Sequence, residues 1–211
     1  MVMVTLKVNS LAKSYASESV FQDLSFQFEG GIIGIAGPNG SGKSTLLRCI
    51  SGLTLPSSGS VVWQVDGKEY SNKTVSGVLG YAAPYVQLYE ELTAIENLTF
   101  IRDLRSNQGC EPITKLIDTF EITQFSDSLF GELSSGQQQR VKLAASSIHQ
   151  PKILCLDEPG TNLDEAGHDI IKQMTRTCVD EGGMVLLASN QNRELELCDD
   201  VLNVAETKVS A

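Results

Sequence analysis

The stretch Gly37-Pro38-Asn39-Gly40-Ser41-Gly42-Lys43-Ser44-Thr45 decides how the rest of this sequence is interpreted. It matches the phosphate-loop pattern G-x-x-x-x-G-K-[ST], in which a glycine-rich loop joins a strand to a helix. Residues 32–36 form an apolar run that is typical of a buried strand, and residues 46–50 continue as a helix. The alternative, a glycine-rich turn before an ordinary helix, is disfavoured because both flanking elements are present.

This loop has the chemistry that a phosphate chain requires. Its glycines let successive N–H groups face one concavity, and the helix N-terminus adds partial positive charge. Lys43 can reach the β- and γ-phosphates, while the Ser44 hydroxyl can bind Mg²⁺. We therefore predict a nucleotide site that includes Gly37, Asn39, Gly40, Ser41, Gly42, Lys43, Ser44 and Thr45.

A second apolar run, residues 153–156, ends in the acidic pair Asp157 and Glu158. Ligands of open α/β sheets bind at the carboxyl ends of the strands, so this pair is expected beside the phosphate loop. We predict that Asp157 is the Mg²⁺ partner through water and that Glu158 is the general base for an attacking water. The alternative, an acidic pair that caps the next element, is less favoured once a phosphate loop is present.

Composition narrows the class of protein further. The chain has 211 residues, of which 41% are hydrophobic, so one α/β domain or two small domains would fit. A net charge of −10 argues against a general nucleic-acid binder. Five cysteines without a C-x-x-C pair suggest neither disulfides nor a zinc site. His149 and His168 stand alone and are expected to be structural or surface residues. The absence of a signal peptide or a long apolar run predicts a cytoplasmic protein.

The pattern along the chain predicts strands first, a helical insertion next, and then alternating strands and helices. An Asp66-Gly67 turn indicates a hairpin. Strands are expected at residues 4–11, 21–28, 32–36, 61–65, 78–82, 153–156, 184–188 and 201–204. Helices are expected within residues 92–130 and at residues 135–148, 165–179 and 193–197.

A third motif carries a specific resemblance. Leu133-Ser134-Ser135-Gly136-Gln137 is similar to the LSGGQ signature of ABC-type ATPases, with a serine at Ser135 where the family usually has glycine. As in that family, it lies between the phosphate loop and the acidic strand. The resemblance runs from about residue 3 to residue 205. It implies a single α/β ATPase domain over residues 1–211: a phosphate-loop core with a mixed sheet, an N-terminal antiparallel β subdomain and a helical subdomain at about 88–150.

The resemblance also assigns further roles. Tyr15 matches the aromatic residue that stacks on adenine, so the implied cofactors are ATP and Mg²⁺. Ser134, Gly136 and Gln137 match the residues that cap the ATP of the opposite subunit, which implies an ATP-dependent head-to-tail homodimer. Residues 160–164 match the loop that runs along this dimer interface.

Two positions depart from the family. The family usually has a metal-binding glutamine in the loop after residue 82, where this chain has Pro84; Gln87 is the alternative ligand if the loop is remodelled. The family's histidine after the strand at 185–188 is replaced by Asn190, whose amide donates a hydrogen bond but carries no positive charge. We predict firm MgATP binding and slow hydrolysis unless a partner intervenes.

The resemblance implies a stand-alone ATPase subunit that powers a separate membrane permease from the inner face of the cell membrane. Residues 85–98 are the expected permease contact, and residues 90–98 loosely resemble short export-type subunits, including the haem-exporter ATPase family. Two other functions stay open. One is a non-transport ABC-type ATPase that acts as a clamp on DNA, ribosomes or a scaffold, and the other is a nucleotide-gated regulator with negligible turnover.

Overall fold

The strand that leads into the phosphate loop lies inside a parallel sheet. The computed structural model describes residues 4–16, 18–105 and 109–204. Strand β3 (Gly31–Ala36) pairs with β8 (Met184–Ser189) on one side and β9 (Asp200–Asn203) on the other. With β7 (Ile153–Asp157) and β6 (Leu79–Ala82), the order is β6-β7-β8-β3-β9, and every neighbouring pair is parallel. The carboxyl ends of β3 and β7 therefore meet at one edge.

Each central strand contributes to two hydrophobic cores. In β7, Ile153 and Cys155 face one core, whereas Leu154 and Leu156 face the other. Successive side chains of a strand point to opposite faces, which explains why this strand is apolar throughout and reads as a continuous run. Asp157, the last residue of the strand, is the first that is not apolar.

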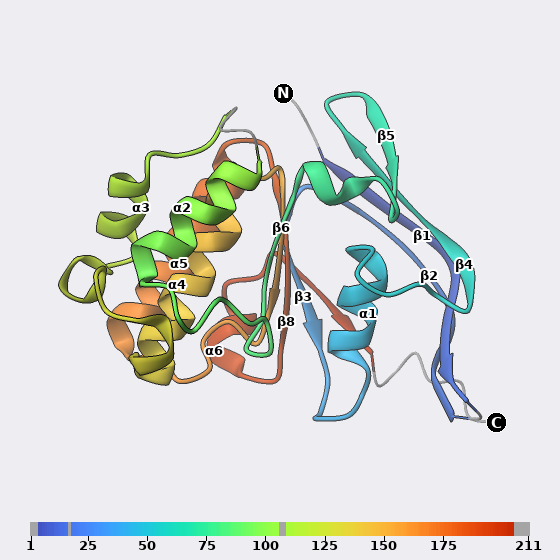
Figure 1. Cartoon of the computed structure of the whole chain (residues 1–211). Helices are drawn as coiled ribbons and strands as arrows, with labels where there is room; N and C mark the ends of the chain where they lie inside the picture. Colours follow the sequence, from blue (N-terminus) through green and yellow to red (C-terminus); the bar gives the residue numbers. More distant parts are fainter. Residues whose placement is uncertain (1–3, 17, 106–108, 205–211) are drawn as a thin grey trace.

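A second, antiparallel sheet covers the face of the first sheet that carries α1 (Lys43–Ile50). Its strand order is β2-β1-β4-β5, and it lies at the right of Figure 1. The indole of Trp63 is fully buried and donates to the carbonyl of Ile50 at 3.1 Å, which joins this sheet to the end of α1. The four strands are β1 (Thr5–Tyr15), β2 (Glu18–Glu29), β4 (Ser58–Val65) and β5 (Lys68–Ser71).

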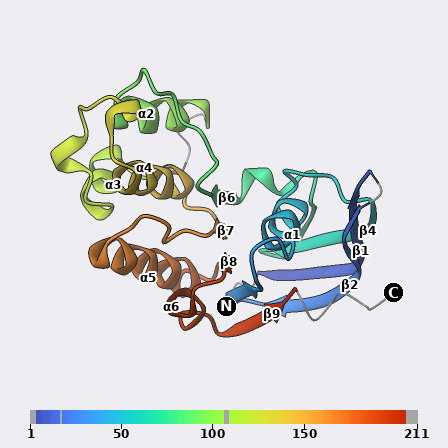
Figure 2. The same cartoon turned by 90° about the horizontal axis from the view of Figure 1, so that it is seen from below.

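Helices cover the opposite face of the parallel sheet (Figures 1 and 2). The first begins at a capping box in which Thr93 accepts from the backbone N–H of Glu96. None of the helices in the described part of the chain is long and apolar enough to cross a membrane. The helices are α2 (Ala94–Leu104), α3 (Ile113–Thr119), α4 (Ser135–Ser147), α5 (Glu165–Asp180) and α6 (Asn192–Leu195). Short 3₁₀ turns occupy Val75–Gly77, Thr123–Phe125 and Phe130–Glu132.

The predicted fold class is confirmed, with one refinement. The expected mixture of parallel and antiparallel strands is divided between two separate sheets instead of sharing one. One reason lies in the pairing of β1, which bonds to β2 on one side and to β4, from Thr5 to Ala12, on the other, so that most of this strand has no free edge. The phosphate loop therefore follows a strand of a purely parallel sheet, and both faces of this sheet are covered by other elements.

Candidate nucleotide-binding site

The loop between β3 and α1 is held in backbone conformations that glycine adopts freely. The φ angles of Gly40 and Gly42 are 77° and 106°, which L side chains rarely tolerate. A Cβ atom on Gly42 would lie 2.7 Å from Cγ1 of Val20. The Lys43 ammonium donates to the carbonyls of Gly37 at 2.9 Å and Pro38 at 3.3 Å, so it lies across the loop. The loop therefore has the curved backbone that a phosphate group requires.

The carboxylate of Asp157 lies beside this loop. Ser44 Oγ donates to Asp157 Oδ1 at 2.9 Å, which joins α1 to the end of β7. Asp157 is only 1% exposed, and its burial raises the pKa of the carboxyl group, opposed by the hydrogen bonds from Ser44 and Tyr85. The first of the two predicted acidic residues therefore meets the predicted metal-binding serine.

Tyr85 makes the second hydrogen bond to this carboxylate and was not predicted from the sequence. Its hydroxyl donates to Asp157 Oδ2 at 3.0 Å and is also hydrogen-bonded to the hydroxyl of Tyr81. The guanidinium carbon of Arg48 lies 5.3 Å from the centroid of its ring. Burial raises the pKa of Tyr85 to about 12, so the phenol keeps its proton at neutral pH. The only sequence signal was the pair of tyrosines on either side of Pro84.

Gln87 does not reach Asp157, the predicted metal ligand, in this structure. Its side chain is exposed and lines a separate cavity with residues 88–91, and it makes no hydrogen bond to Asp157. The Pro84 carbonyl accepts from Lys142 Nζ at 2.6 Å, which holds the loop against α4. With Pro84 held in this way, the loop brings Tyr85 to the carboxylate. The structure thus places a phenol where the sequence suggested an amide.

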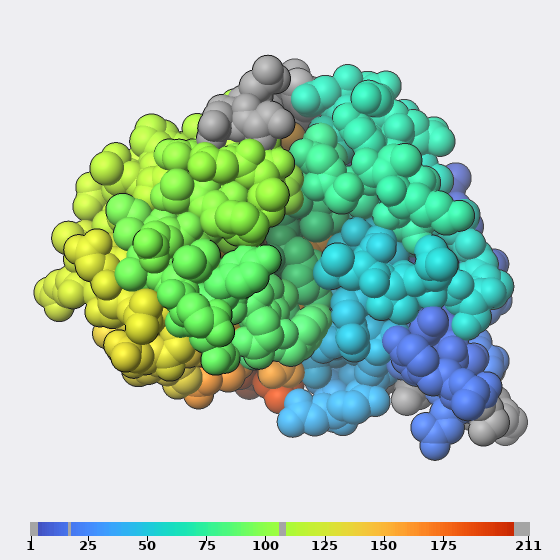
Figure 3. Space-filling view, in the orientation of Figure 1, coloured from blue at the N-terminus to red at the C-terminus, as the bar shows by residue number. Residues whose placement is uncertain are grey.

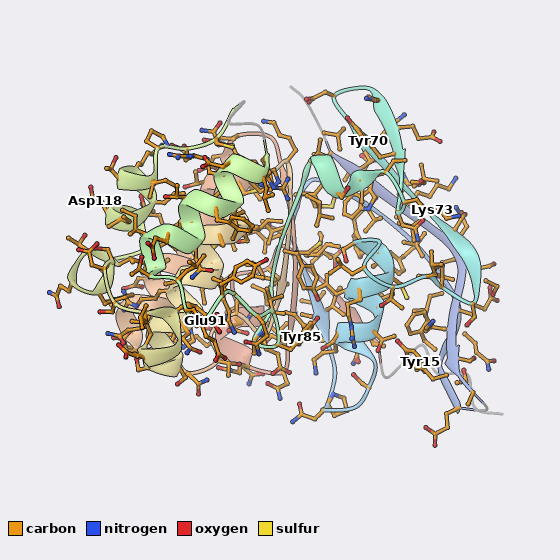
Figure 4. The ribbon with its side chains drawn as sticks, viewed as in Figure 1. Tyr15, Tyr70, Lys73, Tyr85, Glu91 and Asp118 are labelled. Carbon is orange, nitrogen blue, oxygen red and sulfur yellow. The ribbon has the colours of Figure 1, made fainter. Side chains whose placement is uncertain are left out.

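Most of the residues that were predicted around the phosphate loop line one open cavity of about 420 Å³; Gly37 and Ser41 are not among its lining residues. Glu158 lies in it with a left-handed backbone (φ 46°), and its N–H donates to the carbonyl of Ala188 at 2.8 Å. Tyr15 is 48% exposed, and Figure 4 shows it on the opposite side of α1 from Tyr85. Ser41 is buried and its hydroxyl has no partner. The cavity is lined by Tyr15, Val20, Asn39, Gly40, Gly42, Lys43, Ser44, Thr45 and Glu158.

Asn190 joins the end of β8 to the phosphate loop. Its Nδ2 atom donates to Oδ1 of Asn39 at 2.8 Å, across 151 residues of sequence. Both side chains are exposed, so the pair can separate at little cost. The position at which the family resemblance implies a histidine therefore contacts the loop.

The segment Ser134–Gln137 lies apart from this cavity. Ser134 caps α4 by accepting from the N–H of Gln137 at 3.3 Å, while Gln137 Oε1 accepts from the N–H of Ser134 at 2.9 Å. Gly136 lies so close to the loop after β7 that a Cβ atom would meet the Asn162 carbonyl at 2.7 Å. These residues line a second open cavity of about 770 Å³, which shares no residue with the first.

Arg140 organises this second cavity and was also missed from the sequence. Its guanidinium is hydrogen-bonded to Glu121 and lies 2.8 Å from Asp164 Oδ1. Asp164 in turn caps α5 by accepting from the N–H of Gly167 at 2.9 Å. The buried guanidinium therefore ties the start of α5 to α4.

Three features define a phosphate-loop ATPase cassette. They are the phosphate loop, the buried Asp157 carboxylate that accepts from Ser44 of this loop, and the capped N-terminus of α4 in a second cavity. Comparison with known proteins agrees with this class. A family model described as "ABC transporter" matches residues 21–161. The chain therefore belongs to the ABC transporter family, as an ATP-binding and ATP-hydrolysing cassette.

Similar proteins are found in sequence and in structure. The lipopolysaccharide export system ATP-binding protein LptB of Haemophilus influenzae is 32% identical over 220 residues, which cover 99% of this chain and 90% of LptB. The probable multidrug ABC transporter ATP-binding protein YbhF of Escherichia coli is 36% identical over 180 residues, but the chain spans only 31% of YbhF. The dimeric post-hydrolysis structure of the cassette MJ0796 with ADP and Pi matches at a TM-score of 0.84 with 23% identity, covering 98% of this chain and 97% of that one. This last similarity concerns the fold alone.

Proposed function

We propose that this chain is the ATP-hydrolysing subunit that powers a separate membrane permease of an ABC transporter. It acts as one ATPase domain, with the helical subdomain at about 88–150, and it lies on the cytoplasmic face of the membrane through the permease. The observation that carries the proposal is the division of the site: the phosphate loop and Ser134–Gln137 line two cavities that share no residue. In this proposal, one chain supplies one half of each of two nucleotide sites.

A head-to-tail homodimer would complete both sites. The N-terminus of α4 presents free N–H groups and a partial positive charge, which favour an anion such as a γ-phosphate. In the proposed dimer, each ATP lies between the phosphate loop of one copy and Ser134–Gln137 of the other. Separation of the copies after hydrolysis would drive the permease.

The residues around the phosphate loop fit a Mg²⁺ ion. Ser44 and Asp157 offer only oxygen ligands, which Mg²⁺ prefers, and such sites usually add water and substrate phosphates. An Mg²⁺ ion held by these residues would supply positive charge against the negative charge that develops during phosphoryl transfer. Lys43 adds a fixed positive charge, and Glu158 would accept a proton from the attacking water. Tyr15 presents an exposed ring for adenine.

Asn190 is expected to make hydrolysis slow in the isolated protein. Its amide is bonded to Asn39 and must turn to reach a γ-phosphate. Even then it makes a neutral hydrogen bond, which is roughly half as strong as one from a charged imidazolium. A loss of this size in transition-state stabilisation slows hydrolysis by about one or two orders of magnitude.

A groove between the helices and α1 supports the proposed permease contact. Figure 3 shows the hollow between the green helical part and the blue-green residues that follow α1. Its cavity of about 240 Å³ is lined by the basic side chains of Arg105 and Lys142 and by the imidazole of His149, and none of the described residues that line it is acidic. Tyr89 and Phe100 are the sequence neighbours of two residues that line this cavity. Their rings stack edge to face and are 55% and 39% exposed. A permease segment with apolar residues and a carboxylate would complement this groove.

The two departures at Pro84 and Asn190 also favour a second candidate, a nucleotide-gated regulator with negligible turnover. A non-transport ABC-type ATPase that clamps nucleic acid is disfavoured by the net charge of −10. Purification of the full chain from its native membranes separates these functions. Co-purification of a polytopic membrane protein supports the transporter subunit, and its absence together with negligible ATP turnover supports the regulator.

The divided site is tested by mixing two inactive variants. Lys43→Ala disables the phosphate loop. Ser135→Glu places a negative charge opposite the partner's γ-phosphate, although a carboxylate in the first turn of α4 stabilises the helix by about 0.3–1 kcal/mol. Each variant alone should be inactive and folded, with Ser135→Ala as the uncharged control. An equal mixture should recover about a quarter of wild-type turnover, because half of the random dimers are mixed and each has one complete site. Full activity of Ser135→Glu alone would contradict the divided site.

A further inference from the structure

The loop that joins β6 to α2 reaches the metal carboxylate through Tyr85 alone. Both oxygens of Asp157 are occupied, with Ser44 on Oδ1 at 2.9 Å and Tyr85 on Oδ2 at 3.0 Å. Pro84 has no side-chain donor or acceptor, and Gln87 lies in another cavity. The orientation of the buried carboxylate therefore depends on one hydroxyl from each of two elements.

The ring of Tyr85 is held independently of its hydroxyl. The Arg48 guanidinium lies over this ring, with its carbon 5.3 Å from the centroid. Arg48 Nε also donates to the carbonyl of Ser44 at 3.2 Å, so the same guanidinium touches the phosphate-loop helix and the tyrosine. Removal of the hydroxyl alone should leave the ring in place.

Tyr85 is also connected to the groove on the other side of the loop. Its hydroxyl is bonded to that of Tyr81, which lines the groove together with Lys142. Lys142 donates to the Pro84 carbonyl at 2.6 Å, so a residue of the groove wall holds the residue that precedes Tyr85. A continuous set of hydrogen bonds thus runs from the metal carboxylate to the surface proposed for the permease.

We propose that Tyr85 is the positioning residue that orients Asp157 for Mg²⁺ and couples metal occupancy to the groove through Tyr81. The proposal rests on the proposed function as an ATPase subunit. It names the residue that takes the place of the metal-binding glutamine that the family usually has in this loop. A phenol suits this position because it can donate to the carboxylate and accept from Tyr81 at the same time. Side chains that orient a metal ligand typically contribute about 10- to 100-fold to metal affinity.

The first test measures metal affinity without hydrolysis. Mn²⁺ replaces Mg²⁺ in titrations followed by electron paramagnetic resonance, with the full chain and a non-hydrolysable ATP analogue. Tyr85→Phe should weaken Mn²⁺ binding about tenfold, while its affinity for the analogue in EDTA should match the wild type. Gln87→Ala is the matched control from the same loop and should bind Mn²⁺ like the wild type. Wild-type Mn²⁺ affinity in Tyr85→Phe, or a tenfold loss in Gln87→Ala, would overturn the assignment.

The second test measures the coupling. Addition of Mn²⁺ and the analogue should slow hydrogen exchange of residues 81–92 in the wild type and in Gln87→Ala, but not in Tyr85→Phe. Tyr81→Phe should keep Mn²⁺ affinity within about threefold of the wild type and lose this protection. Equal protection in all four proteins would refute the coupling. Neither test needs a permease or a dimer, so failure of the analogue to bind at all would instead count against the ATPase function.

Discussion

The buried histidine His149 allows a quantitative prediction about acid stability. Its Nε2 atom lies 3.2 Å from the Leu79 carbonyl, and Nδ1 is buried without a hydrogen-bond partner among the described residues. Burial, together with the smaller effect of the positive charge of Arg105, lowers the pKa of this imidazole to about 4. The protonated ring is therefore disfavoured in the folded protein, which agrees with the structural role expected from the sequence.

The sign and the size of the effect follow from proton linkage. Because the pKa is lower in the folded state than the ordinary value of 6.5, the unfolded chain binds the proton first as the pH falls. Stability is therefore lost between about pH 6.5 and pH 4 and is fully present above that window. A difference of this size corresponds to about 3 kcal/mol, which we lower to about 2 kcal/mol because the ring is partly exposed to solvent.

The measurement compares the wild type with His149→Gln by urea unfolding at about pH 7.5 and about pH 4.5. Glutamine keeps a donor for the Leu79 carbonyl but does not titrate, so acid effects of the carboxylates cancel in the comparison. The wild type should lose about 2 kcal/mol more unfolding free energy than the variant on acidification. Equal losses in the two proteins would refute the reasoning.

Three further substitutions test the site. Asn190→His should raise ATP turnover of the isolated protein about tenfold, because it restores a charged donor; unchanged turnover would count against a role for this position. Glu158→Gln should lower turnover by at least about 100-fold and preserve ATP affinity, measured by steady-state kinetics and nucleotide titration. Gly42→Ala should destabilise the loop by about 1–2 kcal/mol and weaken ATP binding, because φ is 106° and Val20 occupies the space; thermal unfolding and the same titration check this.

Much of the site could be predicted because it depends on neighbouring residues. The phosphate loop shapes its own concavity, and the glycines that do this, Gly37, Gly40 and Gly42, all have positive φ and lie within the nine-residue stretch 37–45. The strand at 153–157 is buried on both faces and therefore reads as a continuous apolar run that stops at Asp157. The cap of α4 is likewise local, since Ser134 and Gln137 satisfy each other three residues apart.

The partners of the carboxylate could not be predicted, because they come from separate elements. Whether Tyr85 or Gln87 reaches Asp157 depends on the pairing of β6 with β7, in which Tyr81 lies beside Cys155. It also depends on Lys142, which holds the Pro84 carbonyl from α4. The family resemblance implied that the amide of a glutamine lies beside Asp157. No local pattern indicated that the phenol of Tyr85 would take this place.

The sequence by itself thus determined the fold class, the phosphate chemistry and the acidic pair, because these follow from hydrophobic periodicity and from the backbone geometry of contiguous residues. Only the tertiary structure decided which side chain bonds to Asp157, and it put Ser134–Gln137 and Lys43 in different cavities, a separation that the family resemblance alone had implied. Those facts depend on distances between residues far apart in the chain. Such distances are set by the packing of helices and strands, not by local sequence pattern.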